Sequence, residues 1–133
     1  MKNSLTAAFI IALLFVAAWI ACQHLKQSRD ARNTRALAGT WHAHDLGAFT
    51  VRPDGAYVWL FTNLATDRVV TLEGAFKVQS GVLINTVTKS SRTNARVPYV
   101  SHSQIVRVDD QELVIIDGDA GGNVQHTFRK ETK

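Results

Sequence analysis

The sequence predicts an all-β domain, an antiparallel up-and-down meander of about eight strands closing as a small barrel, behind an N-terminal hydrophobic helix. Residues 5–22 form an apolar run of helical length, interrupted only by Thr6. Residues 39–133 alternate short strand-like runs with turn signals, without any βαβ alternation. Pairing of the first and last strands would remove the two exposed edges of such a meander, so we expect closure.

Composition divides the chain into a signal peptide or transmembrane anchor (residues 1–22), a basic linker (23–38) and the barrel domain (39–133). Residues 1–38 carry five basic side chains against one acidic side chain, a net charge of +4. Residues 39–133 carry ten of each kind and net zero. The basic character therefore belongs to the N-terminal part, and we expect no nucleic-acid binding by the domain.

The apolar run is long enough to cross a membrane, because eighteen residues span about 27 Å as a helix. We expect contact with the membrane through residues 5–22, and three fates remain open. The run is retained as an anchor, cleaved near Val16-Ala17-Ala18, or processed as a lipoprotein signal with Cys22 as the lipidated residue. Cys22 follows Ala21 as in a bacterial lipobox, although Trp19 occupies a position usually filled by Leu. As a single cysteine, Cys22 cannot form an internal disulfide. If it is not lipidated, Cys22 is an ordinary residue of the membrane segment.

Two signals disagree on orientation. Lys2 alone precedes the apolar run, whereas four basic residues follow it (Lys26, Arg29, Arg32 and Arg35), which favours a cytoplasmic domain by the positive-inside rule. The order of a short basic segment, an apolar segment and a cysteine is typical of an export signal. We favour a membrane-anchored domain that faces the periplasm in the cell envelope. The basic run then either contacts anionic headgroups or is a solvated linker.

Turn residues and alternation locate the strands. Pro53-Asp54-Gly55 is a strong hairpin turn, and Gly74 indicates a bulge inside a long strand. Residues 31–38 are compatible with a helix that Gly39 ends. The longest loop is expected at 89–96, and the run 112–117 is apolar enough for burial on both faces. The expected strands are Thr40–Asp45, Ala48–Arg52, Ala56–Thr62, Asp67–Val78, Val82–Thr88, one within Val97–Val108, Glu112–Asp117 and Asn123–Lys130.

Several motifs, in order, resemble small bacterial lipocalin-like (calycin) domains over residues 37–130. They are Gly39-Thr40-Trp41, the hairpin from Phe49 to Tyr57, the run Gly74-Ala75-Phe76-Lys77-Val78, and Phe128-Arg129. The resemblance implies that Trp41 plugs the closed end of the barrel and that Arg129 packs across it as a cation–π partner. Gly39, Trp41 and Arg129 are thus expected to be structural.

Two further resemblances are narrower. Gly39-Thr40-Trp41 with Leu46-Gly47 is similar to the start of an avidin strand pair, but the later tryptophans of avidin have no counterpart, so biotin binding is not implied. The chain also resembles lipoprotein-type inhibitors of secreted metalloproteases, which are eight-stranded barrels, although their disulfide is absent here.

The sequence offers little for catalysis or metal binding. His42 and His44 are two apart on a strand and point the same way, but spacing dictates no third ligand, so we expect no metal site. Asp109-Asp110 lies in a turn and does not converge as an acid–base pair must. The sequence lacks a defensible Ser/His/Asp order, a phosphate-cradling glycine loop and a CxxC motif. We therefore expect neither an enzyme nor a cofactor.

Tyr57, Trp59 and Phe61 share one face of a strand and are the candidate ligand-binding residues. An eight-stranded barrel is just wide enough for its own side chains or one small ligand, so these aromatics equally suit a filled core. The first functional hypothesis is a membrane-tethered envelope module that holds a small apolar ligand near the barrel mouth. The second is a protein-interaction or protease-inhibitor module acting through its loops. A cavity above about 300 Å³ would favour the first, and a filled interior would exclude it.

Overall fold

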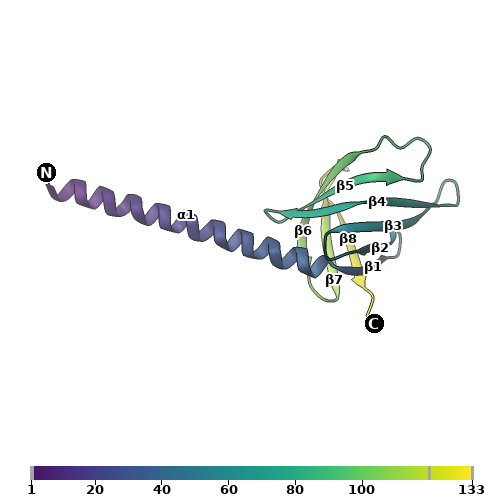
Figure 1. The fold of residues 1–133 in the computed structure, drawn as a ribbon, viewed down its shortest axis with the longest axis horizontal. Coiled ribbons are helices and arrows are strands. Elements are labelled where there is room, and N and C mark those ends of the chain that lie inside the picture. Colours follow the sequence, from purple (N-terminus) through teal and green to yellow (C-terminus); the bar gives the residue numbers. More distant parts are fainter. Residues whose placement is uncertain (1, 120, 133) are drawn as a thin grey trace.

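The computed structural model describes residues 2–119 and 121–132, with side chains described from residue 7 onward. One long helix, α1 (Lys2–Leu37), leads into eight antiparallel strands that close as a barrel in sequence order (Figure 1). The strands are β1 (Gly39–Ala43), β2 (Gly47–Val51), β3 (Ala56–Asn63), β4 (Arg68–Gln79), β5 (Val82–Ser90), β6 (Tyr99–Val108), β7 (Glu112–Asp117) and β8 (Val124–Lys130). The predicted fold class is confirmed.

All eight predicted strands are present, with ends that differ from the prediction by a few residues. Two strand ends differ by two residues: β1 ends at Ala43 rather than Asp45, and β5 continues through Ser90. The connection expected at 89–96 therefore spans residues 91–98. Closure depends on a short seam, in which Trp41 pairs with Lys130 and His42 pairs with Arg129. This seam gives the edges of β1 and β8 partners, as expected for a closed barrel.

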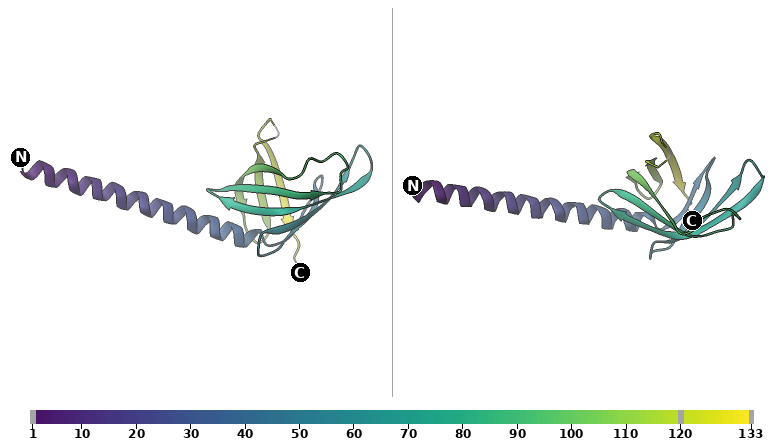
Figure 2. Two further views of the ribbon diagram at one scale, coloured as in Figure 1. Left: turned by 45° about the horizontal axis from the view of Figure 1, so that its top comes forward. Right: turned by 90° about the horizontal axis from the view of Figure 1, so that it is seen from above.

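Helix α1 merges the predicted anchor and the predicted basic linker into one element. It has 36 residues and projects from the barrel as a continuous rod in all views (Figures 1 and 2). Its stretch from Ala7 to Leu37 contains an apolar window with mean hydropathy 2.1, none of which is buried in the protein. The linker is helical because Lys, Arg, Gln and Ala are good helix formers and no Gly or Pro interrupts them before Gly39.

The last turns of α1 dock on one end of the barrel. The Asp30 carboxylate accepts hydrogen bonds from the backbone N–H groups of Ser80 and Gly81, at 2.7 and 3.0 Å. These two residues form the turn between β4 and β5, which lies on the helix side in Figure 1. Leu37, at 2 % exposure, enters the core. We refer to this end of the barrel as the closed end and to the opposite end as the mouth.

Gly74 bends the longest strand, as predicted. The register between β4 and β5 shifts between Glu73 and Gly74, which is a β-bulge. A Cβ atom at Gly74 would collide with the backbone carbonyl of Thr86 on the neighbouring strand. The close approach of the two backbones therefore requires glycine, and the bend lets β4 curve around the barrel.

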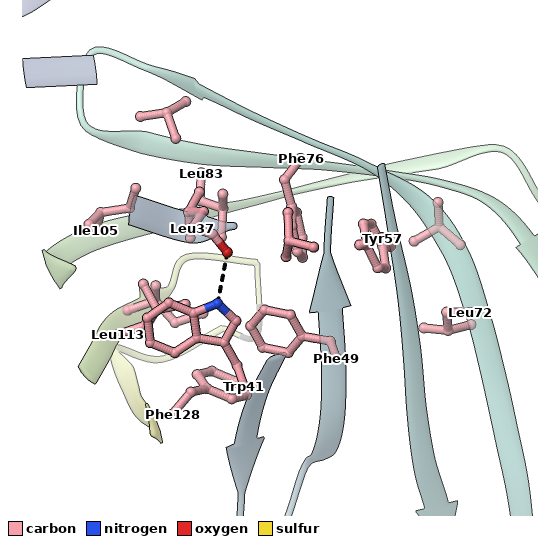
Figure 3. Close-up of a cluster of buried hydrophobic side chains, with 14 of the residues drawn as sticks. Leu37, Trp41, Phe49, Tyr57, Leu72, Phe76, Leu83, Ile105, Leu113 and Phe128 are labelled. Atoms are coloured by element: carbon pink, nitrogen blue, oxygen red, sulfur yellow. Dashed lines mark hydrogen bonds between the residues drawn. The ribbon is translucent and has the colours of Figure 1, made fainter. Parts of the chain in front are cut away.

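Buried hydrophobic side chains cluster around Trp41 (Figure 3). Trp41 is 0 % exposed, and its indole N–H donates a hydrogen bond of 2.8 Å to the carbonyl oxygen of Leu37. Phe49 stacks on Trp41 with ring centroids 6.5 Å apart, and Phe128 and Leu113 are buried beside them. The tryptophan therefore fills the closed end and also satisfies a carbonyl at the end of α1 that has no partner within the helix.

The basic residue over Trp41 is Lys130, which corrects the expected pairing with Arg129. The Lys130 Nζ lies 5.1 Å from the centroid of the Trp41 ring and donates to the carbonyl oxygen of Ala36 at 3.0 Å. Arg129 is exposed and pairs with His42 on the outer face. Side chains alternate along a strand, so an error of one residue moved the assignment to the other face.

Candidate functional site

The barrel interior is not completely filled. A cavity of about 150 Å³ lies inside it, between β2–β4 on one side and β5–β8 on the other. We call this cavity the chamber. Several of its lining residues are half-buried, so the chamber reaches solvent at the mouth. Its lining consists of Leu46, Phe49, Trp59, Phe76, Leu83, Asn85, Ser101, Ser103, Leu113, Ile115, Asp117, His126 and Phe128.

One wall of the chamber is aromatic. The Phe49 ring centroid lies 5.5 Å from Trp59, 5.7 Å from Phe76 and 5.0 Å from Phe128. The four rings therefore form one connected surface, with tilted and edge-on contacts of the kind aromatic side chains prefer. The indole N–H of Trp59 donates to the carbonyl oxygen of Leu46 at 2.6 Å, which fixes the ring at the edge of the chamber.

The opposite wall is polar. Asn85 pairs with Ser101 across β5 and β6, and Ser103 pairs with Asp117 across β6 and β7. His126 follows on β8, where it pairs with Ile115. Directly opposed residues of antiparallel strands project to the same face, so these side chains form a continuous polar arc. The chamber thus combines a large apolar surface with a few convergent polar groups, which is the usual make-up of a small-molecule site.

Tyr57 contacts the polar arc through a hydrogen bond to Asn85. Its hydroxyl donates to the Asn85 side-chain oxygen at 2.6 Å, and its ring stacks on Phe76 with centroids 4.1 Å apart. Burial raises the pKa of Tyr57 to about 12, although the hydrogen bond to Asn85 acts in the opposite direction. The neutral phenol is therefore the stable form, and it orients the Asn85 amide.

The three predicted ligand-binding residues occupy different places. Trp59 lines the chamber, whereas Tyr57 is buried in the core behind two lining residues, Phe76 and Asn85, which it contacts. Phe61 is half-buried and packs against Trp59, with centroids 6.1 Å apart. The ligand-binding role of the three stays a prediction.

Sequence reasoning missed the polar arc. Its clearest signal is the run Ser101-His102-Ser103-Gln104, in which every residue is polar and hydrophobic alternation is absent. Such a run does not reveal which side chains face inward. Only pairing with Asn85 on β5 and with Asp117 on β7 decides that the two serines line the chamber.

His42 and His44, for which the sequence predicts no metal site, lie on the outer surface. His42 is 3.5 Å from a carboxylate oxygen of Glu131, and His44 is 2.7 Å from Asp45. The hydrogen bond to the Asp45 carboxylate, together with the negative charge of that group, raises the pKa of His44. In residues 2–119 and 121–132, no three side chains of His, Cys, Asp or Glu gather as metal ligands. Cys22 is exposed on α1, and its lipidation stays a prediction.

A larger hollow of about 370 Å³ lies elsewhere, on the outer surface beside the Gly74 bulge. It is a shallow, open groove with Arg52, Glu73 and Lys89 in its lining, and the last two form an ion pair of 3.1 Å. An open charged groove offers little enclosure to a small molecule. The chamber is the better candidate because it is concave and largely apolar.

Comparisons of this chain with models of protein families, with curated proteins and with solved structures found no match. The resemblance to lipocalin-like domains therefore stays a resemblance, supported by the closed eight-stranded barrel and by Trp41 at its closed end.

Proposed function

We propose that the protein is a membrane-tethered, lipocalin-like binding module that holds one small, partly apolar ligand in the chamber. The observation that carries this proposal is an unfilled interior of about 150 Å³ with an aromatic wall facing a polar arc. Typical ligand pockets begin at about 300 Å³, the size that would have favoured a lipocalin-type ligand. The chamber is half that size, comparable to an engineered cavity of about 150 Å³ that takes up benzene. The ligand is therefore benzene-sized or only slightly larger.

The tether is α1. At about 1.5 Å per residue, residues 5–22 account for a bilayer core, and residues 23–37 extend about 22 Å beyond it. Asp30, which holds the barrel through Ser80 and Gly81, lies about 12 Å beyond Cys22 on this scale. The headgroup layer on one side is about 5–7 Å thick, so the closed end of the barrel sits just outside it. Lys26, about 6 Å beyond Cys22 on the same scale, then lies at headgroup level, where anionic lipids attract it.

This arrangement turns the mouth away from the membrane that carries the anchor. The closed end holds Leu37, Trp41 and the docked helix, whereas β7 starts at the closed end and finishes at Asp117 beside the chamber. A ligand therefore enters from the aqueous side and not from the bilayer. We assign the barrel to the periplasmic side of the cell envelope, because the N-terminal segment has the order of an export signal.

The fate of the N-terminal segment decides how the module is tethered. Mass spectrometry of the mature protein from membranes distinguishes a retained Met1, an earlier cleavage and a lipidated Cys22 as the first residue. Loss of residues 1–22 without lipidation would contradict the membrane tether.

Ligand binding is tested with the full chain in detergent by measuring the melting temperature against a set of small aromatic and aliphatic compounds. A ligand that binds only the folded state at 100 times its Kd stabilises that state by about 2.7 kcal/mol. We expect some compounds to raise the melting temperature of the wild type and of Ser103→Ala. Ser103→Phe fills the chamber, so it should abolish the response. Equal responses of the wild type and Ser103→Phe would contradict binding in the chamber.

A second candidate function is a protein-interaction or inhibitor module that acts through the mouth loops. One observation favours it: apolar side chains are exposed around the mouth. Leu64, in the loop between β3 and β4, is 90 % exposed, and Val97, Tyr99 and Val124 are exposed on or beside the strand ends at the same rim.

Crosslinking in membranes from the source cell, followed by pull-down, tests this second function. Leu64→Asp combined with Tyr99→Asp should remove a partner that binds the rim. Val58→Asp is the matched control, because Val58 is an exposed apolar residue on the outer face of β3, away from the mouth. Retention of every partner after replacement of residues 91–98 and of both rim residues would exclude a loop-mediated function.

A further inference from the structure

We infer that the chamber selects small organic cations, in particular a primary ammonium group attached to a compact apolar body. This inference rests on the proposed function, because it names the class of ligand for the same chamber. Three features lead to it: the charge of the lining, the arrangement of the aromatic rings, and the acceptors beside the one carboxylate.

The charge of the lining is negative. Among the described side chains that form the chamber wall, Asp117 is the only carboxylate, and no lysine or arginine is present. His126 is the other ionisable residue of the lining. A carboxylate in a partly enclosed site attracts a cation more strongly than in open water and repels an anion. The same wall that accepts an ammonium group therefore disfavours a carboxylate ligand of similar size.

The aromatic wall strengthens this preference. Phe49, Trp59 and Phe128 form a triangle of rings with centroid separations of 5.0, 5.5 and 6.2 Å. A cation close to the face of an aromatic ring is attracted by the ring quadrupole, and the attraction increases when water is excluded. The rings also provide apolar contact for the body of the ligand, which suits an amine that carries an aromatic or short aliphatic group.

The polar arc offers acceptors where an ammonium group would lie. Ser103 directly opposes Asp117, and Ser101 lies two residues away on the same face of β6. An ammonium group has three donors and no acceptor, so one carboxylate and two hydroxyl oxygens match it. The backbone N–H of Asp119 donates to an oxygen of Asp117 at 3.0 Å, which holds the carboxylate in place in the absence of ligand.

The experiment uses the full chain in detergent at pH 7 and follows the three indole N–H signals by NMR. Trp59 borders the chamber, whereas Trp41 lies at the closed end, hydrogen-bonded to Leu37, and Trp19 lies on the exposed part of α1. The Trp59 signal therefore reports binding, and the other two signals are internal controls for folding and for effects on the detergent. The probes are benzylammonium, benzyl alcohol and benzoate, which have similar sizes and differ in charge.

We expect benzylammonium to shift the Trp59 signal with a Kd about tenfold lower than that of benzyl alcohol, and benzoate to bind most weakly. Asp117→Asn keeps the shape and removes the charge, so the tenfold preference should fall to less than about twofold. Asp45→Asn is the matched control: it removes an exposed carboxylate from the loop between β1 and β2, and the preference should remain.

The possible failures are distinguishable. Equal binding of the three probes at Trp59, or an unchanged preference in Asp117→Asn with the Trp41 signal in place, would overturn the cation assignment and leave a ligand-binding chamber. If no probe shifts the Trp59 signal at saturating concentration, the cation assignment is overturned and the proposed function loses its support as well.

Discussion

The two ends of this barrel differ in the burial and the polarity of their side chains. At the closed end, Leu37, Trp41 and Leu113 are almost completely buried, and Lys130 spans the Trp41 ring and the end of α1. At the mouth, Asp117 and His126 are only half-buried, and they border the chamber. The closed end therefore maximises burial, whereas the mouth leaves room and polar groups in the interior.

If the chamber binds a ligand as proposed, this difference separates stability from binding within one small domain. Burial of large apolar side chains dominates stability, so the closed end should carry most of the free energy of unfolding. Polar groups beside an unfilled cavity add little to the free energy of unfolding. Ligand binding would explain why the polar arc is present in the chamber. Mutations at the two ends should consequently differ in kind. Closed-end mutations should destabilise the barrel, and mouth mutations should change binding.

The largest expected effect is at Trp41. Trp41→Ala should lower the free energy of unfolding by about 3–5 kcal/mol, because it leaves a cavity in the core and removes a hydrogen bond to the end of α1. Trp59→Ala, at the mouth, should cost about half as much, since Trp59 is only partly buried and already borders a cavity. Denaturant unfolding of the full chain in detergent measures both values, and equal losses would remove the distinction between the two ends.

Tyr57, near the start of β3, should produce a pH effect. Its folded-state pKa of about 12 is above the ordinary value of 10.0, so the protein favours the neutral phenol. This contribution is complete below pH 10 and is lost as the pH rises through 12. A shift of two units corresponds to about 2–3 kcal/mol. The free energy of unfolding of the wild type should fall more steeply from pH 10 to pH 12 than that of Tyr57→Phe; parallel curves would refute this.

The docking of α1 on the closed end should contribute a smaller amount. Asp30→Ala removes the acceptor for two backbone N–H groups of the turn between β4 and β5, and should cost about 1–2 kcal/mol. Hydrogen exchange should also become faster in the last turns of α1. Asp110→Ala, in the exposed turn between β6 and β7, is the matched control with the same charge change. Similar exchange in the two variants would show that Asp30 does not hold the helix.

The smallest expected effect tests which basic side chain packs over Trp41 at the closed end. Lys130→Met keeps much of the aliphatic stem but loses the cation–π contact and the hydrogen bond to Ala36, so it should cost about 1 kcal/mol. Arg129→Gln, on the outer face, should change the free energy of unfolding by less than about 0.5 kcal/mol. Thermal unfolding of both variants measures the two effects. A larger destabilisation by Arg129→Gln than by Lys130→Met would indicate that Arg129, not Lys130, packs over Trp41.

Much of the barrel could be predicted because its signals are local. Pro53-Asp54-Gly55 ends one strand and starts the next, and Gly74 marks the bulge, since turn and bulge geometry depend on a few adjacent residues. The apolar run of 5–22 determines a helix by composition alone. The site was less predictable. Of the aromatic triplet at 57, 59 and 61, only Trp59 lines the chamber, because which part of the shared inward face remains unfilled depends on residues from other strands.

The sequence by itself determined a long apolar helix and eight strands, because alternation, turns and hydrophobic runs act over short distances. Only the tertiary structure decided that Lys130 rather than Arg129 lies over Trp41 and that α1 runs unbroken into the closed end. It alone brought Ser103 and Asp117 together beside an aromatic wall. Those outcomes depend on strand register and barrel closure, which bring distant residues into contact and which no local pattern encodes.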